Sequence, residues 1–104
     1  MSMIEQLTYL SKFFNTATKD NRIGATHISL YMALFQFWHL NHFENPISFT
    51  RQEVMPLAKI NGRATYHKCI NELHEYGYIK YVPSYNPVLK SIVYFVDSND
   101  ADHK

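Results

Sequence analysis

The stretch from Phe49 to Ile79, FTRQEVMPLAKINGRATYHKCINELHEYGYI, decides the fold. Its first helix is predicted over Arg51 to Ala58, because Thr50 and Glu53 have the spacing of a capping box. A tight connection at residues 59–62, which contains a glycine, leads into a second helix. Two helices joined by such a turn form a helix-turn-helix.

The second helix is predicted from Arg63 to Tyr76, with Gly77 after it as a left-handed cap. Its inward stripe consists of the apolar residues at helical spacing, which are Tyr66, Cys69, Ile70, Leu73 and Tyr76. Its outward face holds the remaining polar side chains, which include Arg63, Thr65, His67, Lys68 and Asn71.

A β-hairpin is predicted after the helix-turn-helix. Tyr78 to Val82 and Ser91 to Val96 have the composition of strands, and Pro83 to Lys90 form the turn between them. The polar and acidic residues 97–104 are expected to form a disordered tail.

Another helix is predicted near the start of the chain, from about Met3 to Asn15, because Ser2 and Glu5 repeat the capping-box spacing. It belongs to an N-terminal arm of residues 1–18, and Thr16 to Ala25 are expected to form a long loop. Its apolar positions recur at spacings of four, three and four residues, at Met3, Leu7, Leu10 and Phe14.

A core helix is predicted over residues 26–43, with Thr26 as its cap, and Ile47 to Phe49 are expected to form a short apolar link after it. The core helix carries two apolar stripes, Ile28, Tyr31, Phe35 and Trp38 on one and Leu30, Leu34 and Phe37 on the other. More than half of its circumference therefore requires burial. The helix is either simply the centre of the core or also part of a subunit interface, so we expect a homodimer formed through the first two helices.

The composition is typical of one folded domain, which we expect over residues 1–96. The 104 residues carry a net charge of +1, and 46% of them are hydrophobic. The expected fold is mainly helical with a small β-hairpin, of the α+β class. Its parts are the arm (1–18), the core helix (26–43), the helix-turn-helix (50–77) and the hairpin (78–96).

The cysteine content and the apolar stretches bear on location. Cys69 is the single cysteine, which excludes an internal disulfide and is typical of the reducing cytoplasm. The first ten residues contain Glu5 and lack a basic region followed by an apolar run, so we expect no signal peptide. Ile28 to Leu40 is the longest apolar stretch and is shorter than the about 20 residues that cross a bilayer. We expect a cytoplasmic protein without a membrane partner.

The order of helix-turn-helix and hairpin is that of a winged helix. Phe49 to Ile79 has a Thr-x-x-Glu cap, a Leu-Ala-Lys-Ile end to its first helix, an Arg-x-Thr start to its second and a Glu-Leu-x-x-x-Gly-Tyr-Ile exit. In these features it resembles the winged helix-turn-helix of small bacterial regulators and of replication proteins of phages and mobile elements. Ile28 to Asn45, with its LYMALFQFW core, is similar to small winged-helix proteins of integrated mobile elements. The resemblance implies a winged helix with an extra N-terminal helix and a role as a DNA-binding transcriptional regulator.

Sequence-specific binding of duplex DNA needs a helix that offers cations to phosphates and planar polar groups to base edges in the major groove. Arg63, in the first turn of the second helix, is the best candidate for a bidentate guanine contact, worth about 1–3 kcal/mol of discrimination. Thr65 and Asn71 suit bases or phosphates, and Lys68 suits a phosphate. The other candidates, on the same face, at the start of the preceding helix and on the wing, are His67, Thr50, Arg51, Lys80, Tyr85 and Lys90. A two-fold dimer predicts an inverted repeat with half-sites about 10 bp apart.

The modest charge leaves a second function open. Residues 50–81 hold five basic and three acidic side chains, a net charge of only +2. Such charges also occur on ordinary solvated helices, and winged helices serve several roles. The alternative is a protein-interaction module, or an accessory of replication or mobilisation, with weak or no DNA binding.

Other kinds of site have little support in the sequence. His39 and His42 are spaced i, i+3, whereas His67, Cys69 and His74 do not form a single ligand cluster on their helix. The chain has no Cys-x-x-Cys, no Gly-x-Ser-x-Gly and no phosphate-binding glycine loop. We therefore expect no metal, no cofactor and no enzymatic activity.

The tyrosines near the hairpin allow two interpretations. One interpretation is a platform on which the bases of single-stranded nucleic acid stack, formed by Tyr78, Tyr81, Tyr85 and Tyr94. Their spacing also fits the two faces of a hairpin packed on helices, which is the simpler interpretation. Tyr85, at the tip of the hairpin, is the tyrosine expected to touch DNA.

Overall fold

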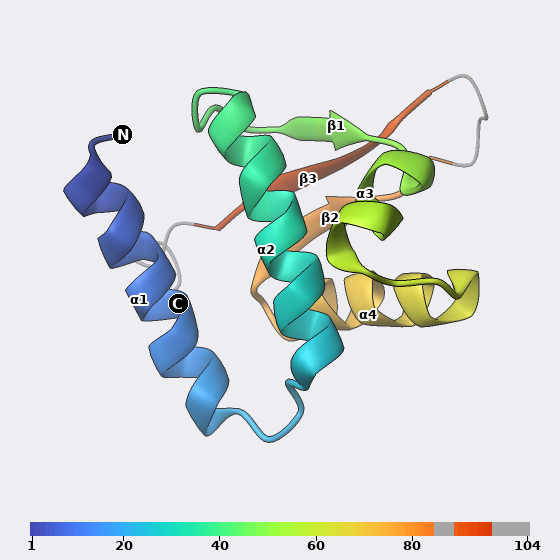
Figure 1. Ribbon diagram of the computed structural model, residues 1–104, viewed down its shortest axis with the longest axis horizontal. Helices are drawn as coiled ribbons and strands as arrows, with labels where there is room; N and C mark the ends of the chain where they lie inside the picture. The colour runs from blue at the N-terminus through green and yellow to red at the C-terminus, as the bar shows by residue number, and fades with distance from the viewer. Residues whose placement is uncertain (85–88, 97–104) are drawn as a thin grey trace.

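A computed structural model describes residues 1–84 and 89–96 of the chain. In chain order its elements are α1 (Met3–Lys19), α2 (Ala25–Leu40), β1 (Ile47–Phe49), α3 (Arg51–Ala58), α4 (Arg63–Glu75), β2 (Ile79–Val82) and β3 (Ser91–Phe95) (Figure 1). The chain is mainly helical with a small antiparallel sheet, which confirms the α+β class. Tyr85 and the tail at residues 97–104 lie outside the described residues.

Local capping signals set the starts of two helices, as predicted. The Thr50 Oγ1 accepts from the Glu53 N–H over 3.3 Å, and the Glu53 carboxylate accepts from the Thr50 N–H over 2.9 Å. Ser2 and Glu5 make the same reciprocal pair at the start of α1. Each capping box gives a side-chain acceptor to two backbone N–H groups at the start of its helix, where no preceding turn supplies one.

The two helices of the predicted helix-turn-helix end in left-handed backbone. Lys59 closes α3 at φ 60°, and Gly77 follows α4 at φ 88°. The α3 boundaries agree with the prediction, while α4 ends at Glu75, one residue before the predicted end. Glycine adopts left-handed backbone readily because glycine lacks a Cβ atom. Gly77 is therefore suited to stop the helix and turn the chain into β2.

The sheet has three strands, in the order β1-β3-β2. The predicted apolar link at Ile47–Phe49 is wrong, because this segment is strand β1 and pairs antiparallel with β3. Ile47 and Tyr81 both lie opposite Val93, one from each side. The segment is too short to show a strand pattern, and its hydrogen-bonding partner is more than forty residues further along the chain. The two strands of the hairpin are each one residue shorter than predicted and span Ile79–Val82 and Ser91–Phe95.

The N-terminal half of the chain is more helical than predicted. The expected long loop at Thr16–Ala25 is wrong, because α1 continues to Lys19 and only residues 20–24 connect it to α2. Ala17 is buried one turn after Phe13, and that burial extends the helix past its predicted end. Gly24, not Thr26, is the N-cap of α2, and α2 ends at Leu40 instead of residue 43.

The core is built around α2, which runs antiparallel to α1 and crosses in front of the sheet (Figure 1). Aromatic rings join its elements: Phe13 of α1 stacks on Tyr31 at 3.7 Å between centroids, and Trp38 stacks on Phe95 of β3 at 4.5 Å. The other stripe of α2, at Leu30 and Leu34, is fully buried. A single subunit therefore covers most of the apolar surface of α2.

Among the described residues, α1 carries more exposed large hydrophobic side chains than any other element. Of the four apolar positions that recur along this helix, Met3, Leu7 and Phe14 are 74%, 60% and 41% exposed. The face that enters the core instead carries Phe13 and Ala17. Both sets have helical spacing, so the choice between them depends on the shape of the surface that α1 meets.

No helix in the described part of the chain combines the length and the apolar character needed to cross a membrane.

Candidate nucleic-acid interface

A hollow of about 440 Å³ lies between the start of α3, the outer side of α4 and the base of the β2–β3 hairpin. We call it the interface hollow. Among the residues that line it are five of the predicted DNA contacts, namely Thr50, Arg51, His67, Asn71 and Lys90. These residues come from three elements or their ends, so the tertiary structure brings together side chains up to forty positions apart in sequence.

Thr50 and Lys90 both interact with Glu53 on this side of the molecule. The Thr50 hydroxyl donates to Glu53 Oε1 over 3.0 Å, in addition to the backbone N–H of Thr50. The hydrogen bonds from Thr50 lower the pKa of Glu53, and Lys90 adds a smaller effect in the same direction. Glu53 is therefore ionised near neutral pH, and its carboxylate already accepts from the Thr50 N–H.

Lys90 forms an ion pair with this same carboxylate, at 3.5 Å between Nζ and Glu53 Oε1. The two side chains are 50% and 42% exposed. Exposed pairs of this kind contribute little free energy, about 0–1 kcal/mol, because water screens them. A phosphate can thus compete with Glu53 for Lys90.

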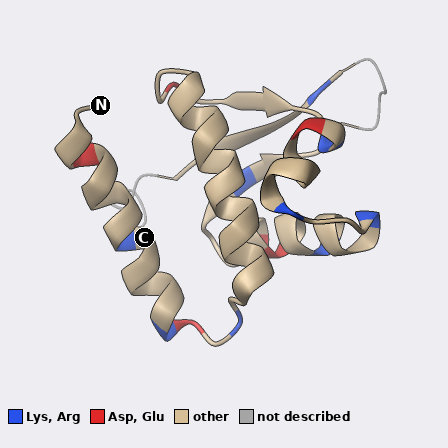
Figure 2. Ribbon diagram, in the orientation of Figure 1, with Lys and Arg blue, Asp and Glu red and all other residues tan. Residues whose placement is uncertain are grey.

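The outer side of α4 is exposed along its length. His67 and Asn71 lie one turn apart, and the Asn71 amide donates to the His67 carbonyl over 2.7 Å. Arg63, Thr65 and Lys68 are exposed on the same helix but do not line the interface hollow. Lys and Arg positions recur along α3, α4 and the base of the hairpin, with acidic positions between them (Figure 2).

Lys80, one of the predicted DNA contacts, lies away from the interface hollow. Side chains alternate between the two faces of a strand, and Tyr81, its neighbour on β2, lines the interface hollow. Lys80 therefore lies on the other face of the sheet, where its Nζ is 5.4 Å from the ring centroid of Tyr94. Lys80 is therefore not among the predicted contacts that gather around the interface hollow.

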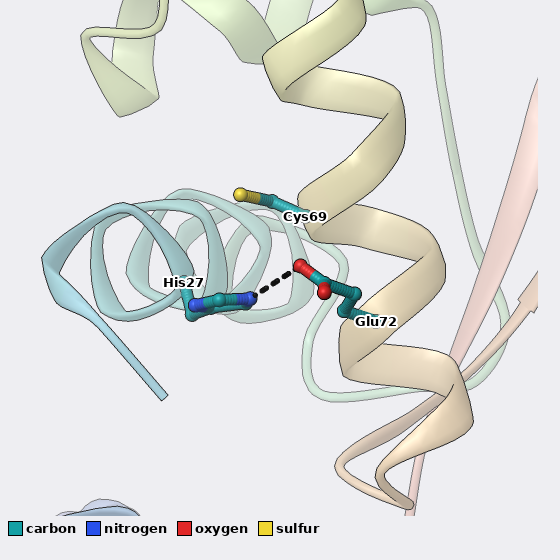
Figure 3. A group of neighbouring side chains, drawn as sticks. All are labelled: His27, Cys69 and Glu72. Carbon is teal, nitrogen blue, oxygen red and sulfur yellow. Dashed lines mark hydrogen bonds and ion pairs between the residues drawn. The ribbon is translucent and has the colours of Figure 1, made fainter. Parts of the chain in front are cut away.

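Sequence reasoning missed a polar group behind α4, made of His27, Cys69 and Glu72 (Figure 3). His27 Nε2 lies 3.0 Å from Glu72 Oε1, and its Nδ1 accepts from the Gly24 N–H over 3.0 Å. Because Nδ1 is an acceptor, the ring proton is on Nε2, which donates to Glu72. Local patterns do not reveal this pair, since the two residues are 45 positions apart.

Glu72 is held in place from both sides. Its second oxygen accepts from the Tyr76 hydroxyl over 3.1 Å. The hydrogen bond from His27 lowers the pKa of Glu72, and that from Tyr76 adds to the effect. Burial raises the pKa of the Cys69 thiol, which favours its neutral form. The Glu72 carboxylate is thus turned toward α2 and away from the outer side of α4.

The group of His27, Cys69 and Glu72 does not fit a resident metal. Its three possible ligand atoms lie within 4.8 Å of one another. A metal bound at His27 Nε2 would place the ring proton on Nδ1, which then needs an acceptor. The atom opposite Nδ1 is the Gly24 nitrogen, which is itself a donor. The arrangement suits a hydrogen-bonded link between α2 and α4.

The histidines considered in the sequence do not gather either. His39 and His42 are exposed, and His42 lies beyond the end of α2. His74 Nδ1 accepts from the Tyr81 N–H over 3.0 Å, which ties α4 to β2. The position of His74 is therefore explained by packing of the helix on the sheet.

Comparisons of the chain with protein-family models, with curated proteins and with solved structures find no significant match. The function has to follow from the geometry of the chain itself. That geometry offers an exposed polar helix beside a hollow lined by basic and amide side chains, and it is suited to binding an anionic or polar partner.

Proposed function

We propose that this protein is a winged-helix transcriptional regulator that binds duplex DNA, with α4 in the major groove and the β2–β3 hairpin against the neighbouring backbone. The observation that carries the proposal is the set of five predicted contacts around the interface hollow. His67 and Asn71 lie on α4, and the other three flank it, with the start of α3 on one side and the base of the hairpin on the other. A polar helix entering the groove between segments that touch phosphates is the docking geometry of helix-turn-helix proteins.

The charge distribution along α4 supports the same orientation. Arg63 is its first residue, the first turn contains no acidic residue, and Lys68 follows within two turns. The positive end of the helix dipole lies at this end as well. Glu72, in the second half, is drawn inward by His27. The first half of α4 is therefore the part suited to approach phosphates.

The proposal includes a homodimer, formed through α1 instead of through α1 and α2 together. Met3, Leu7 and Phe14 are exposed, and with the half-buried Leu10 they keep the four-three-four spacing of a two-helix seam. Ile4, beside them, is 76% exposed. At about 1.5 Å per residue α1 is long enough to pair with its copy over three to four turns. The two-fold symmetry of such a dimer predicts that its DNA site is an inverted repeat.

The DNA contact is tested by fluorescence anisotropy of a labelled mixed-sequence duplex, titrated over a range of salt concentrations. We expect binding whose log K falls with log salt by about 0.9 for each phosphate contact. The double variant Arg63→Ala, Lys68→Ala should lose most of the affinity and lower this slope.

The matched control is the double variant Lys80→Ala, Lys19→Ala. It removes the same charge from the opposite face of the sheet and from the last turn of α1. This variant should bind DNA like the unmodified chain. An equal loss of affinity in both double variants would argue against α4 as the binding helix.

One observation favours the alternative of a protein partner. Glu53 neutralises Lys90 at the edge of the interface hollow, so the surface there is mixed in charge instead of uniformly basic. Mixed charge suits a protein surface better than a run of phosphates. Absence of DNA binding by the folded chain at low salt would favour this alternative.

A further inference from the structure

The interface hollow contains a buried phenol, that of Tyr66, which lines it from the start of α4 and is only 2% exposed. Its hydroxyl makes no hydrogen bond within residues 1–84 and 89–96. Buried phenols usually have such a partner, because burial removes the hydrogen bonds that the hydroxyl makes with water. The Tyr66 hydroxyl is therefore available to a group bound in the hollow.

Arg51 lines the same hollow from the first position of α3. It is half-buried, and in the described part of the chain its guanidinium makes neither a hydrogen bond nor an ion pair. Lys90, the other Lys or Arg among the described residues of the lining, is paired with Glu53. Because the charges of Lys90 and Glu53 offset each other, Arg51 leaves the hollow with a net charge of +1.

The two groups without partners favour the same kind of ligand. Burial raises the pKa of Tyr66 well above its usual value, and the positive charge of Arg51 acts in the opposite direction. The phenol stays protonated at neutral pH, so its hydroxyl is a donor. A guanidinium also offers only donors, and donors of both kinds form their strongest hydrogen bonds with oxyanions. The pair therefore suits a phosphate.

The surroundings of the pair agree with an anion that belongs to a larger molecule. The start of α3 is the positive end of a helix dipole, and its first turn has N–H groups that no preceding turn pairs. The hollow, at about 440 Å³, is larger than a bare phosphate needs and lies within the range of about 300–1,000 Å³ typical of ligand sites. It has room for a phosphate together with the sugar attached to it.

We propose that the interface hollow binds one phosphate group of the DNA backbone, with the Tyr66 hydroxyl and the Arg51 guanidinium as its side-chain donors. The proposal rests on the proposed function and adds Tyr66, which the sequence places on the inward stripe of α4. A phosphate held between the starts of α3 and α4 would fix the position of α4 on the duplex without reading its sequence.

The test compares two variants of the full chain in anisotropy titrations with a labelled mixed-sequence duplex at several salt concentrations. Tyr66→Phe removes one hydroxyl and keeps the ring. It should lower the affinity about tenfold at every salt concentration and leave the salt slope unchanged, because a neutral donor displaces no counterion. Arg51→Gln should also lower the affinity, and it should reduce the slope by about 0.9.

Matched controls remove the same groups elsewhere. Tyr94→Phe removes a phenol hydroxyl from the other face of the sheet, beside Lys80. Lys19→Gln removes a positive charge from the last turn of α1. Both controls should bind the duplex like the unmodified chain. Circular dichroism checks that each variant is folded.

A titration of the unmodified chain with inorganic phosphate, followed by NMR of the protein amides, distinguishes the DNA backbone from a free phosphate ligand. Inorganic phosphate should not saturate the hollow at micromolar concentration, because it lacks the contacts that the rest of the duplex makes. Saturation in that range would overturn the assignment to the DNA backbone.

The titrations also separate this proposal from the proposed function. If the unmodified chain binds the duplex and folded Tyr66→Phe binds it equally well, the phosphate site is overturned and DNA binding stands. Equal losses in Tyr66→Phe and Tyr94→Phe would likewise overturn the site alone. A folded unmodified chain that binds no duplex at low salt would overturn both proposals.

Discussion

The ring of His27 donates from Nε2 to Glu72 Oε1 over 3.0 Å and so joins the first turn of α2 to α4. The other ring nitrogen accepts from the N–H of Gly24, the N-cap of α2. One side chain therefore caps the central helix and positions the helix that we propose to bind DNA. The Tyr76 hydroxyl extends this link to the end of α4.

The His27–Glu72 pair predicts how stability depends on pH. The pKa of Glu72 is lowered in the folded chain, so its contribution is fully present above the unfolded value of about 4.3 and is lost as the pH falls through the folded pKa. Glu72→Gln should lower Tm at neutral pH, and the difference from the unmodified chain should shrink below about pH 4.

Thermal unfolding followed by circular dichroism between neutral and acidic pH measures this difference. Glu75→Gln, an exposed carboxylate on the same helix, is the matched control and should change Tm little at any pH. A Glu72→Gln curve parallel to that of the unmodified chain would contradict the role of the pair.

From the ion pair between Glu53 and Lys90 we predict that a variant without the Glu53 charge binds DNA more tightly. Glu53→Gln keeps the capping box with Thr50, because glutamine also serves at this position, but it releases Lys90 from its ion pair. We expect DNA affinity to rise by about two- to tenfold at low salt, with a steeper salt dependence by up to about one phosphate contact. Anisotropy titrations at several salt concentrations measure both quantities.

The control for this variant is Lys90→Ala, which should lower the affinity. If Glu53→Gln leaves both affinity and salt slope unchanged, Lys90 does not approach phosphates.

The exposed stripe of α1 predicts the oligomeric state. Leu7 is 60% exposed at the middle of the stripe, so Leu7→Glu should leave the fold intact and convert a dimer into a monomer. Light scattering of the unmodified chain should give the mass of two subunits at micromolar concentration. Thr8→Glu, an exposed neighbour outside the stripe, should remain a dimer. A one-subunit mass for the unmodified chain would exclude the α1 pairing.

Substitution of Gly77 should lower stability through the backbone conformation alone. Its φ of 88° is unfavourable for residues with a Cβ atom, yet no atom lies within 4 Å of the place where that Cβ would be. Gly77→Ala should therefore cost about 1–2 kcal/mol of unfolding free energy. Gly77→Asn should cost less, because asparagine adopts left-handed backbone more readily. Urea unfolding measures both, and equal losses would show that the cost is not conformational.

The sequence alone determined the features that depend on neighbours within one helical turn. The start of α3 followed from the reciprocal Thr50–Glu53 pair, and the end of α4 followed, to within a residue, from Gly77. The buried stripe of α4 was also correct at Tyr66 and Leu73, since a single helix pattern was available there. In each case the hydrogen bonds or contacts involved link residues three or four positions apart, so the local pattern contains the information.

Only the tertiary structure decided which surfaces meet. It chose the Phe13 face of α1 over the Leu7 face, although both have helical spacing. It paired β1 with β3, placed Lys80 on the far side of the sheet, and joined His27 to Glu72. These outcomes depend on strand register and on packing between segments tens of residues apart, and no local spacing determines either one.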